Sequence, residues 1–383
     1  MINRTEQMIS RLSTLNLQEQ KNSYQMSTGR KLQNGSDDSV LYAREVFIND
    51  KIRTYEGLKS QVEKTSIQNN IADSSMSEIK KILEFMKAEL IKANTATTTE
   101  DGITAIAANI SGLKENLYQL ANTQAEGEYV FAGSDSSVRP FEKDLNGNIK
   151  YVGNSQLRRV AVEEDSYRER GITGFDMMMY ASSVATKGET LTFKETDRII
   201  DQNGNEWKLN SPVNNTLTKY DLNGNITAET ITPITNDSLT PPTYSADSTI
   251  MPTTDGTRFE AKTNVFSFID DTVNALKKVD NLGNPISSEE SRAQISKNLG
   301  EIDKVYDGLN VAHAELGGKN KVFEVSLERI TSKLTQYNIL DKQIGAADLT
   351  KVAMEAKALE LTYTALYSTI NRTNQLSLVN FLN

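Results

Sequence analysis

Residues 295–344 read ISKNLGEIDKVYDGLNVAHAELGGKNKVFEVSLERITSKLTQYNILDKQI, and this stretch decides the fold. Sustained alternation of three- and four-residue spacings is typical of long helices that pack along a seam. At a rise of about 1.5 Å per residue, the predicted helix is about 75 Å long. Its seam positions are Ile295, Leu299, Ile302, Tyr306, Leu309, His313, Leu316, Asn320, Phe323, Leu327, Ile330, Leu334, Tyr337, Asp341 and Ile344.

The same alternation holds over residues 41–90, with polar interruptions at Glu45, Lys59, Thr65 and Asn69. After a break at residues 95–102, a shorter run extends from Ile106 to Leu120. A compact domain cannot bury helices of about 75 Å against itself. The sequence therefore predicts an elongated molecule.

Every proline lies between Pro140 and Pro285, so both ends of the chain are free of the residue that most strongly breaks helices. The middle is rich in Thr, Asn, Ser and Pro and holds β-type runs at 190–193 and 206–209. We predict an α + β fold, an elongated bundle of long coiled-coil-like helices formed from both chain ends, with an inserted β-rich domain. Trp207 is expected in the core of the insert.

The apolar stripe slips by one residue beside Gly345, which indicates a boundary there. Beyond it, the stripe of the last helix has its nearest match in a weaker stripe near the N-terminus, and isolated helices are marginal in water. We predict terminal assembly helices at 1–35 and 348–383 that are disordered in the monomer, a helical rod domain at 36–133 and 265–347, and a β-rich outer domain at 134–264. The expected assembly interface comprises Leu12, Leu15, Met26, Val352, Leu359, Tyr363, Leu366, Ile370, Leu378 and Phe381.

Composition excludes several functions for this chain of 383 residues. Its net charge of −9 argues against nucleic-acid binding, which needs a basic surface. It has no run of 18 apolar residues, so no membrane insertion is expected. Residues 1–7 lack the apolar core of a signal peptide, so we expect either a cytoplasmic protein or export by another route. The absence of cysteine removes disulfides and thiolate chemistry.

Catalytic groups are scarce. The single histidine, His313, falls on the helical seam with Asn320 and Asp341, where polar residues more often fix register than perform catalysis. Glu163 and Glu164 could act as acids, but nothing in the sequence converges on them. The acidic pair at 37–38 is explained by the dipole of the helix that follows. We expect no catalytic residue, no cofactor and no metal.

Asp-x-Asn-Gly-Asn occurs three times, beginning at Asp144, Asp201 and Asp221. A calcium loop can begin in this way, but the glycine and glutamate that complete an EF-hand loop are missing. Asn-Gly between two β-prone flanks is the strongest short hairpin signal. The hairpin turn is the favoured interpretation, and the metal site is the second.

Three segments carry a resemblance to a known family: residues 25–38 (QMSTGRKLQNGSDD), residues 127–134 (GEYVFAGS) with Pro140-Phe141 after them, and residues 377–382 (SLVNFL). The chain resembles the bacterial flagellin superfamily and, within it, the hook-associated junction proteins of the FlgL type. The resemblance covers about residues 1–180 and 265–383. The middle is left without a match.

The resemblance implies a non-enzymatic adaptor at the hook-filament junction of the bacterial flagellum, located outside the cell and exported by the flagellar type III apparatus without a cleaved signal. Its implied partners are copies of itself in a ring, a FlgK-type hook-associated protein, flagellin and a flagellar export chaperone. Filament flagellin is the nearest competing interpretation, and residues 129–134 argue against it. Two more distant interpretations are a flagellin-like shell with an enzyme in its middle and a generic coiled-coil protein.

Overall fold

The computed structural model describes residues 2–95, 97–145, 147–186, 188–210, 215–221, 225–236, 243–247 and 258–381, with side chains from Glu6 to Arg372 within these ranges. The chain forms two compact units, residues 1–60 with 327–383, and residues 61–326. Two helices, α2 (Ser39–Ala93) and α6 (Ser288–Gly345), contribute residues to both.

The helical part of the 61–326 unit is built from α2 and α6 with α3 (Glu100–Ala121) and α5 (Val265–Leu276). Most apolar positions of the predicted α2 seam are buried, and those of the α6 seam are buried or half-buried, which confirms the periodicity argument. Thr99 and Asn264 cap α3 and α5 with side-chain oxygens that accept from Gly102 and Phe266 amides. The core is lined chiefly by Met76, Ile79, Leu83, Met86, Leu90, Ile110, Leu117, Phe266, Phe268, Ile269, Ile295, Ile302, Leu309 and Leu316.

Short β-ribbons follow α3 and pack on this helical core. Phe141 and Ile149, from the β3–β4 ribbon, and Met177, from α4, are buried members of it. The ribbons pair β1 (Gln124–Ala125) with β2 (Glu128–Tyr129), β3 (Phe141–Lys143) with β4 (Ile149–Tyr151), and β5 (Arg159–Glu163) with β6 (Ser166–Glu169), and α4 spans Gly174–Met178.

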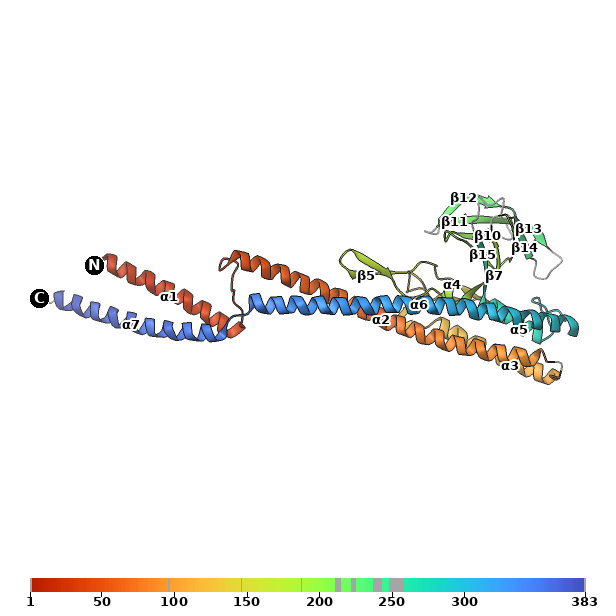
Figure 1. The fold of residues 1–383 in the computed structure, drawn as a ribbon, viewed down its shortest axis with the longest axis horizontal. Coiled ribbons are helices and arrows are strands. Elements are labelled where there is room, and N and C mark those ends of the chain that lie inside the picture. The colour runs from red at the N-terminus through yellow and green to blue at the C-terminus, as the bar shows by residue number, and fades with distance from the viewer. Residues whose placement is uncertain are drawn as a thin grey trace. The chain divides into compact units, whose positions relative to one another are not determined.

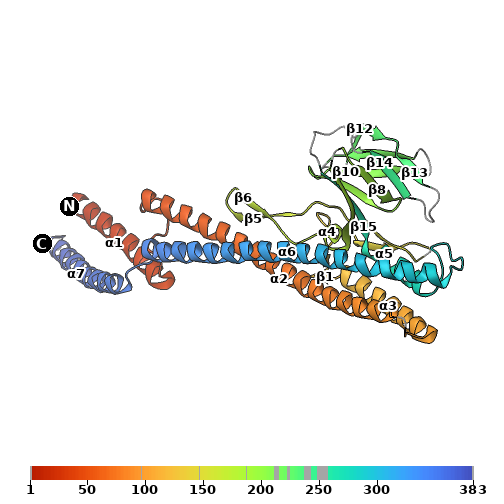
Figure 2. The same ribbon diagram turned by 45° about the vertical axis from the view of Figure 1, so that its right-hand side comes forward.

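The outer β part has a core of its own around the fully buried Trp207, as predicted, with Phe259 packed edge-on against it. Its strands form two sheets, ordered β12-β11-β10-β9-β15-β7 and β13-β14-β8, and Figure 2 draws this part with several of its strands labelled. The runs predicted as strands are β8 and β10. The strands are β7 (Met179–Thr186), β8 (Thr190–Lys194), β9 (Arg198–Asp201), β10 (Glu206–Asn210), β11 (Thr216–Tyr220), β12 (Ile226–Ile231), β13 (Ile234–Asn236), β14 (Thr243–Asp247) and β15 (Arg258–Asn264).

The Asp-x-Asn-Gly-Asn segment at Asp201–Asn205 forms a turn. The amide of Asn205 donates to Asp201 Oδ1 at 3.0 Å, between the paired strands β9 and β10, which confirms the hairpin interpretation there. The same bond recurs from Asn148 to Asp144 and from Asn225 to Asp221, although Asn146 and residues 222–224 lie outside the described residues. A turn not predicted from the sequence, from Asp280 to Asn284, repeats the pattern at 2.8 Å.

The other unit contains α1 (Ile2–Thr28), the start of α2, the end of α6, and α7 (Leu349–Phe381). Within it, Tyr55 stacks on Tyr337 with ring centroids 5.6 Å apart, so the predicted α2 and α6 seams meet here. Figure 1 shows α1 and α7 side by side and antiparallel, with the two chain ends at the same end of the pair. Long helices combined with β-sheets confirm the α + β class.

Candidate functional site

The terminal helix pair, defined as α1 and α7, is the candidate functional site. Asp348 starts α7, because its Oδ1 accepts the amides of Thr350 and Lys351 at 3.1 Å each. An isolated helix of this kind is marginal in water, so each of the two needs an apolar partner. The structure provides that partner from the opposite end of the chain.

Seven of the ten predicted assembly residues are buried or half-buried on this pair, and we call these seven the inner seam. Val352 is buried, and Leu12, Leu15, Leu359, Tyr363, Leu366 and Ile370 are half-buried. Met26 is exposed. The side chains of Leu378 and Phe381 lie outside the described residues. The Tyr363 hydroxyl hydrogen-bonds Asn16 Oδ1, and the pKa of Tyr363 is raised by desolvation and then by its hydrogen bond to Glu19.

A second set of apolar side chains on the pair faces solvent, and sequence reasoning missed it. Ile9, Leu17, Met354 and Leu361 are 62%, 64%, 63% and 65% exposed. We call these four residues the outer stripe. Single exposed apolar side chains are normal in folded proteins, whereas several on one surface can mark an interaction site. The sequence did contain one signal for this set: Met354 and Leu361 are seven residues apart, about two helical turns, and therefore lie on the same face of the helix.

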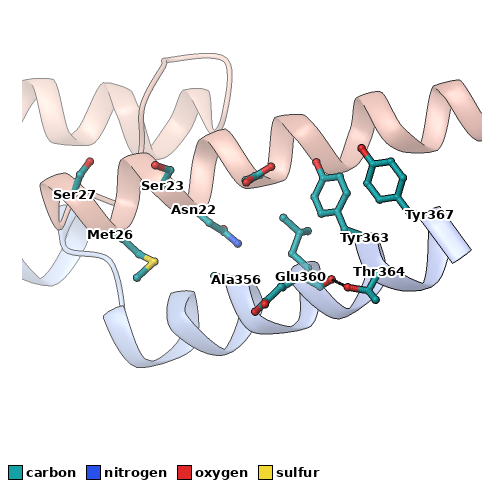
Figure 3. A pocket seen from close by; sticks show the side chains of 11 residues that line it. Asn22, Ser23, Met26, Ser27, Ala356, Glu360, Tyr363, Thr364 and Tyr367 are labelled. Atoms are coloured by element: carbon teal, nitrogen blue, oxygen red, sulfur yellow. Dashed lines mark hydrogen bonds between the residues drawn. The ribbon is translucent and has the colours of Figure 1, made fainter.

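Two grooves run along the pair. The tyrosine groove, about 630 Å³, is shown in Figure 3 and is lined by Glu19, Asn22, Ser23, Met26 and Ser27 of α1 and by Ala356, Leu359, Glu360, Tyr363, Thr364 and Tyr367 of α7. The corner groove, about 930 Å³, reaches the loops at 31–38 and 346–348 and includes Lys21, Lys351 and Val352.

Two loops hold the base of the pair together. The amide of Lys31 donates to the carbonyl of Gly345 at 2.8 Å, and the amide of Ala347 donates to the carbonyl of Gly29 at 2.8 Å. Gly29 has φ +67°, a conformation that glycine adopts without strain. The side-chain amide of Gln25 donates to the Lys31 carbonyl at 2.6 Å. These backbone bonds join the segment that follows α1 to the segment between α6 and α7.

The acidic residues of this loop serve its backbone. Asp37 Oδ2 accepts the amides of Gln33 and Asn34 at 3.0 Å each, and the bonds from Asn34 and Gln33 lower the pKa of Asp37. Asp38 Oδ1 accepts a hydrogen bond from the Leu41 amide at 2.9 Å, in the first turn of α2. The acidic pair therefore lies at the start of a helix, as the sequence predicted. These residues fall within the quoted 25–38 segment.

Comparison with known proteins agrees with this geometry. Residues 3–136 match the family of the bacterial flagellin N-terminal helical region. Over about its first third, the chain is thus similar to bacterial flagellins. Over 160 residues it is 27% identical to flagellar hook-associated protein 3 of Escherichia coli (strain K12), covering 39% of this chain and 47% of that protein. It is 25% identical over 152 residues to the protein of the same name in Salmonella typhimurium, covering 37% and 45%.

The chain thus matches about half the length of each of these curated relatives. Its fold is similar to the crystal structure of flagellar hook-associated protein-3 from Legionella pneumophila. The TM-score is 0.52 at 19% identity, over 78% of this chain and 98% of that one. At this identity the similarity concerns the fold.

Residues 127–134 have a structural role in the 61–326 unit. Gly133 has φ +89°, and a Cβ there would lie 2.5 Å from the Asn154 carbonyl oxygen, so glycine is required. Phe131 is fully buried. Glu128 accepts from Arg170 and Gln68 at 3.1 and 3.0 Å and so ties β2 to α2.

The remaining candidates lie elsewhere in the 61–326 unit. His313 Nε2 is 2.9 Å from Asp73 Oδ1 and Nδ1 is 3.3 Å from Lys80 Nζ, so this histidine connects α6 with α2. Glu163 ends β5, and Glu164 lies in the turn that leads to β6. No cluster of three potential His, Asp or Glu metal ligands occurs among the described residues. None of the helices in the described ranges is long and apolar enough to cross a membrane.

Proposed function

We propose that this chain is a structural adaptor at the hook-filament junction of the bacterial flagellum. It would sit in a ring of its own copies, with a FlgK-type hook-associated protein on one side and flagellin on the other. A flagellar export chaperone would hold the chain before its export by the type III route without a cleaved signal. In this role it performs no enzymatic reaction, and its site is an assembly surface.

The observation that carries this proposal is the terminal helix pair with its exposed outer stripe. Burial of apolar surface contributes about 25 cal/mol per Å². Leu17 and Leu361, from opposite ends of the chain, each expose about two thirds of their surface, so covering them in an assembly is favourable. An assembly subunit needs such a reserve of unburied apolar surface, whereas a monomeric protein does not.

Filament flagellin remains the second candidate, because the family that matches residues 3–136 is the flagellin N-terminal region. The two candidates differ in what their loss does. A junction subunit is needed before flagellin can add, so its loss leaves hooks without filaments and flagellin in the medium. Loss of a flagellin shortens or alters the filaments themselves.

The test is electron microscopy of cells that lack this protein, together with analysis of the growth medium. Bare hooks with secreted flagellin, restored to full filaments by the wild-type gene on a plasmid, are the expected result. Truncated or altered filaments would select flagellin instead. Normal filaments and motility would contradict both roles.

A further inference from the structure

The tyrosine groove has an electronegative lining. Tyr363 and Tyr367 stack with ring centroids 6.3 Å apart and an interplanar angle of 21°, and Figure 3 shows both rings along one side of the groove. Glu19 and Glu360 contribute carboxylates from the two helices. All eleven lining residues are described, and none is Lys, Arg or His. Aromatic faces combined with carboxylates are the surroundings that a guanidinium prefers.

Lys357 already forms an ion pair with one lining residue, Glu360, but it does not itself line the groove. Lys357 Nζ lies 2.6 Å from Glu360 Oε2, but both side chains are about two thirds or more exposed. An exposed i,i+3 ion pair contributes little, typically about 0–1 kcal/mol. Glu360 can therefore exchange this partner for a better placed cation.

Helix α1 itself supplies a matching cation. Among the described side chains of α1, which begin at Glu6, the cations are Arg11 and Lys21. Lys21 lines the corner groove, and its charge helps to lower the pKa of Asp37. Arg11 is exposed, and no ion pair involves it among the residues that the structure describes.

Arg11 cannot reach the tyrosine groove of its own chain. It precedes Glu19 by eight residues, which places it about 12 Å away along the helix axis and about 80° around it. Arg11 is absent from the lining of the groove, although every lining residue is described. A contact between this arginine and this groove is therefore a contact between two copies.

We infer that the tyrosine groove of one copy receives Arg11 of a second copy. The arginine would lie against the Tyr363 and Tyr367 rings and pair with Glu19 and Glu360. The two surfaces differ, so the contact is head-to-tail and repeats from copy to copy, as a ring requires. This inference rests on the proposed assembly function and specifies its partner.

A charge swap tests the contact. Arg11→Glu and Glu19→Arg, each as the sole copy in cells, are expected to lower the number of filaments per cell by roughly tenfold, since each places like charges together. In the double variant Arg11→Glu/Glu19→Arg, the acidic residue 11 of one copy again meets a basic residue 19 in the next copy. This variant should therefore restore most filaments. Arg372→Glu, another exposed terminal cation, is the matched control and should neither disturb assembly nor rescue Glu19→Arg.

Self-association of the purified full-length proteins, followed by analytical ultracentrifugation at low and high salt, separates this inference from the proposed function. Salt-sensitive association that each single variant weakens and the double variant restores supports the Arg11 contact, even if the deletion strain keeps its filaments. A double variant no better than the weaker single variant, or rescue of Glu19→Arg by Arg372→Glu, overturns it. Wild-type protein that associates neither in cells nor in solution also overturns it.

Discussion

The amide of Ala347 donates to the carbonyl of Gly29 at 2.8 Å, although the two residues come from opposite ends of the chain. Lys31 and Gly345 form the companion bond, so the end of α1 and the end of α6 meet in a small two-bond bridge. Glu45 accepts from Arg30 at 3.2 Å beside it. A Cβ at Gly345 would lie 3.3 Å from Glu45 Oε1, so the loop corner is closely packed. This corner fixes where α1 ends and where α7 begins.

The terminal helices should be the least stable part of the monomer. Their seam residues are mostly half-buried, and each helix gains its order from one partner. We predict that limited proteolysis cuts within residues 1 to about 35 and about 348–383 in the monomer, and that assembly protects both segments. Mass spectrometry of the fragments identifies the sites. Equal resistance of these segments and of residues 61–326 would contradict the prediction.

Charges on the two faces of α7 should have different effects. Leu366→Asp places a carboxylate in the half-buried inner seam, at a cost of about 2 kcal/mol to the helix pair, and blocks incorporation. Leu361→Asp alters the outer stripe, so the monomer keeps its helicity while incorporation falls. Ser368→Asp, at an exposed polar position, is the control. Circular dichroism and motility measure the two effects, and normal motility with Leu366→Asp would count against the assembly role.

Two glycines in one segment offer a matched test of backbone strain. Gly133→Ala should lower the free energy of unfolding by about 3 kcal/mol, because it adds a left-handed alanine and a clash with Asn154. Gly127 has φ +81° but open space around it, so Gly127→Ala should cost about 1 kcal/mol. Urea unfolding of both variants gives the comparison. Equal losses would show that the contact with Asn154 is unimportant.

The Glu128 cluster should make stability depend on pH. Burial alone would raise the pKa of Glu128, but hydrogen bonds from Arg170 and Gln68, with the charges of Arg170 and Lys64, outweigh it and lower the pKa to about 2. A depressed pKa in the folded state stabilises above the ordinary value of 4.5, and this contribution is lost as pH falls from 4.5 toward 2.

Glu128→Gln should therefore be less stable than wild type at pH 7, and the difference should shrink as pH falls through this window. Glu126→Gln removes a neighbouring, half-exposed carboxylate and serves as the control. Thermal unfolding between pH 7 and about pH 2.5 measures both across the range in which the carboxylate is protonated. A stability difference for Glu128→Gln that stays constant over this range would assign its effect to packing instead of charge.

The outer β part should be dispensable for the helices. Strands β7 and β15 pair with Thr186 opposite Arg258, so residues 187–257 can be replaced by Asn-Gly, a two-residue hairpin turn. The deletion removes Lys194, which lies 2.8 Å from Asp271, and exposes Phe259, so the variant also carries Asp271→Asn and Phe259→Thr. We expect it to be exported and to support some filament growth.

The control is the full-length chain with the same two substitutions. Filament counts and secreted protein are measured in cells that carry only one form. Complete loss of filaments with stable, secreted deletion protein would mean that the outer β part makes an essential contact.

The sequence alone determined the long helices and the outer strands. Three-four spacing over tens of residues leaves one face to bury, and Ile302, Leu309 and Leu316 are accordingly buried on α6. The Asn-Gly turn at 203–204 was equally readable, because its backbone geometry is a local property. The β-rich middle followed from the same local signals.

Only the tertiary structure decided which surfaces of the terminal helices remain exposed. A helical stripe indicates that a face will be covered, but not by which segment, because the partner comes from the far end of the chain. Leu366 lies in the inner seam and Leu361 in the outer stripe, although both are leucines on the same helix. The bridge from Gly29 to Ala347 and the grouping of Tyr363, Tyr367 and Glu19 likewise depend on how the two chain ends meet, which no local pattern specifies.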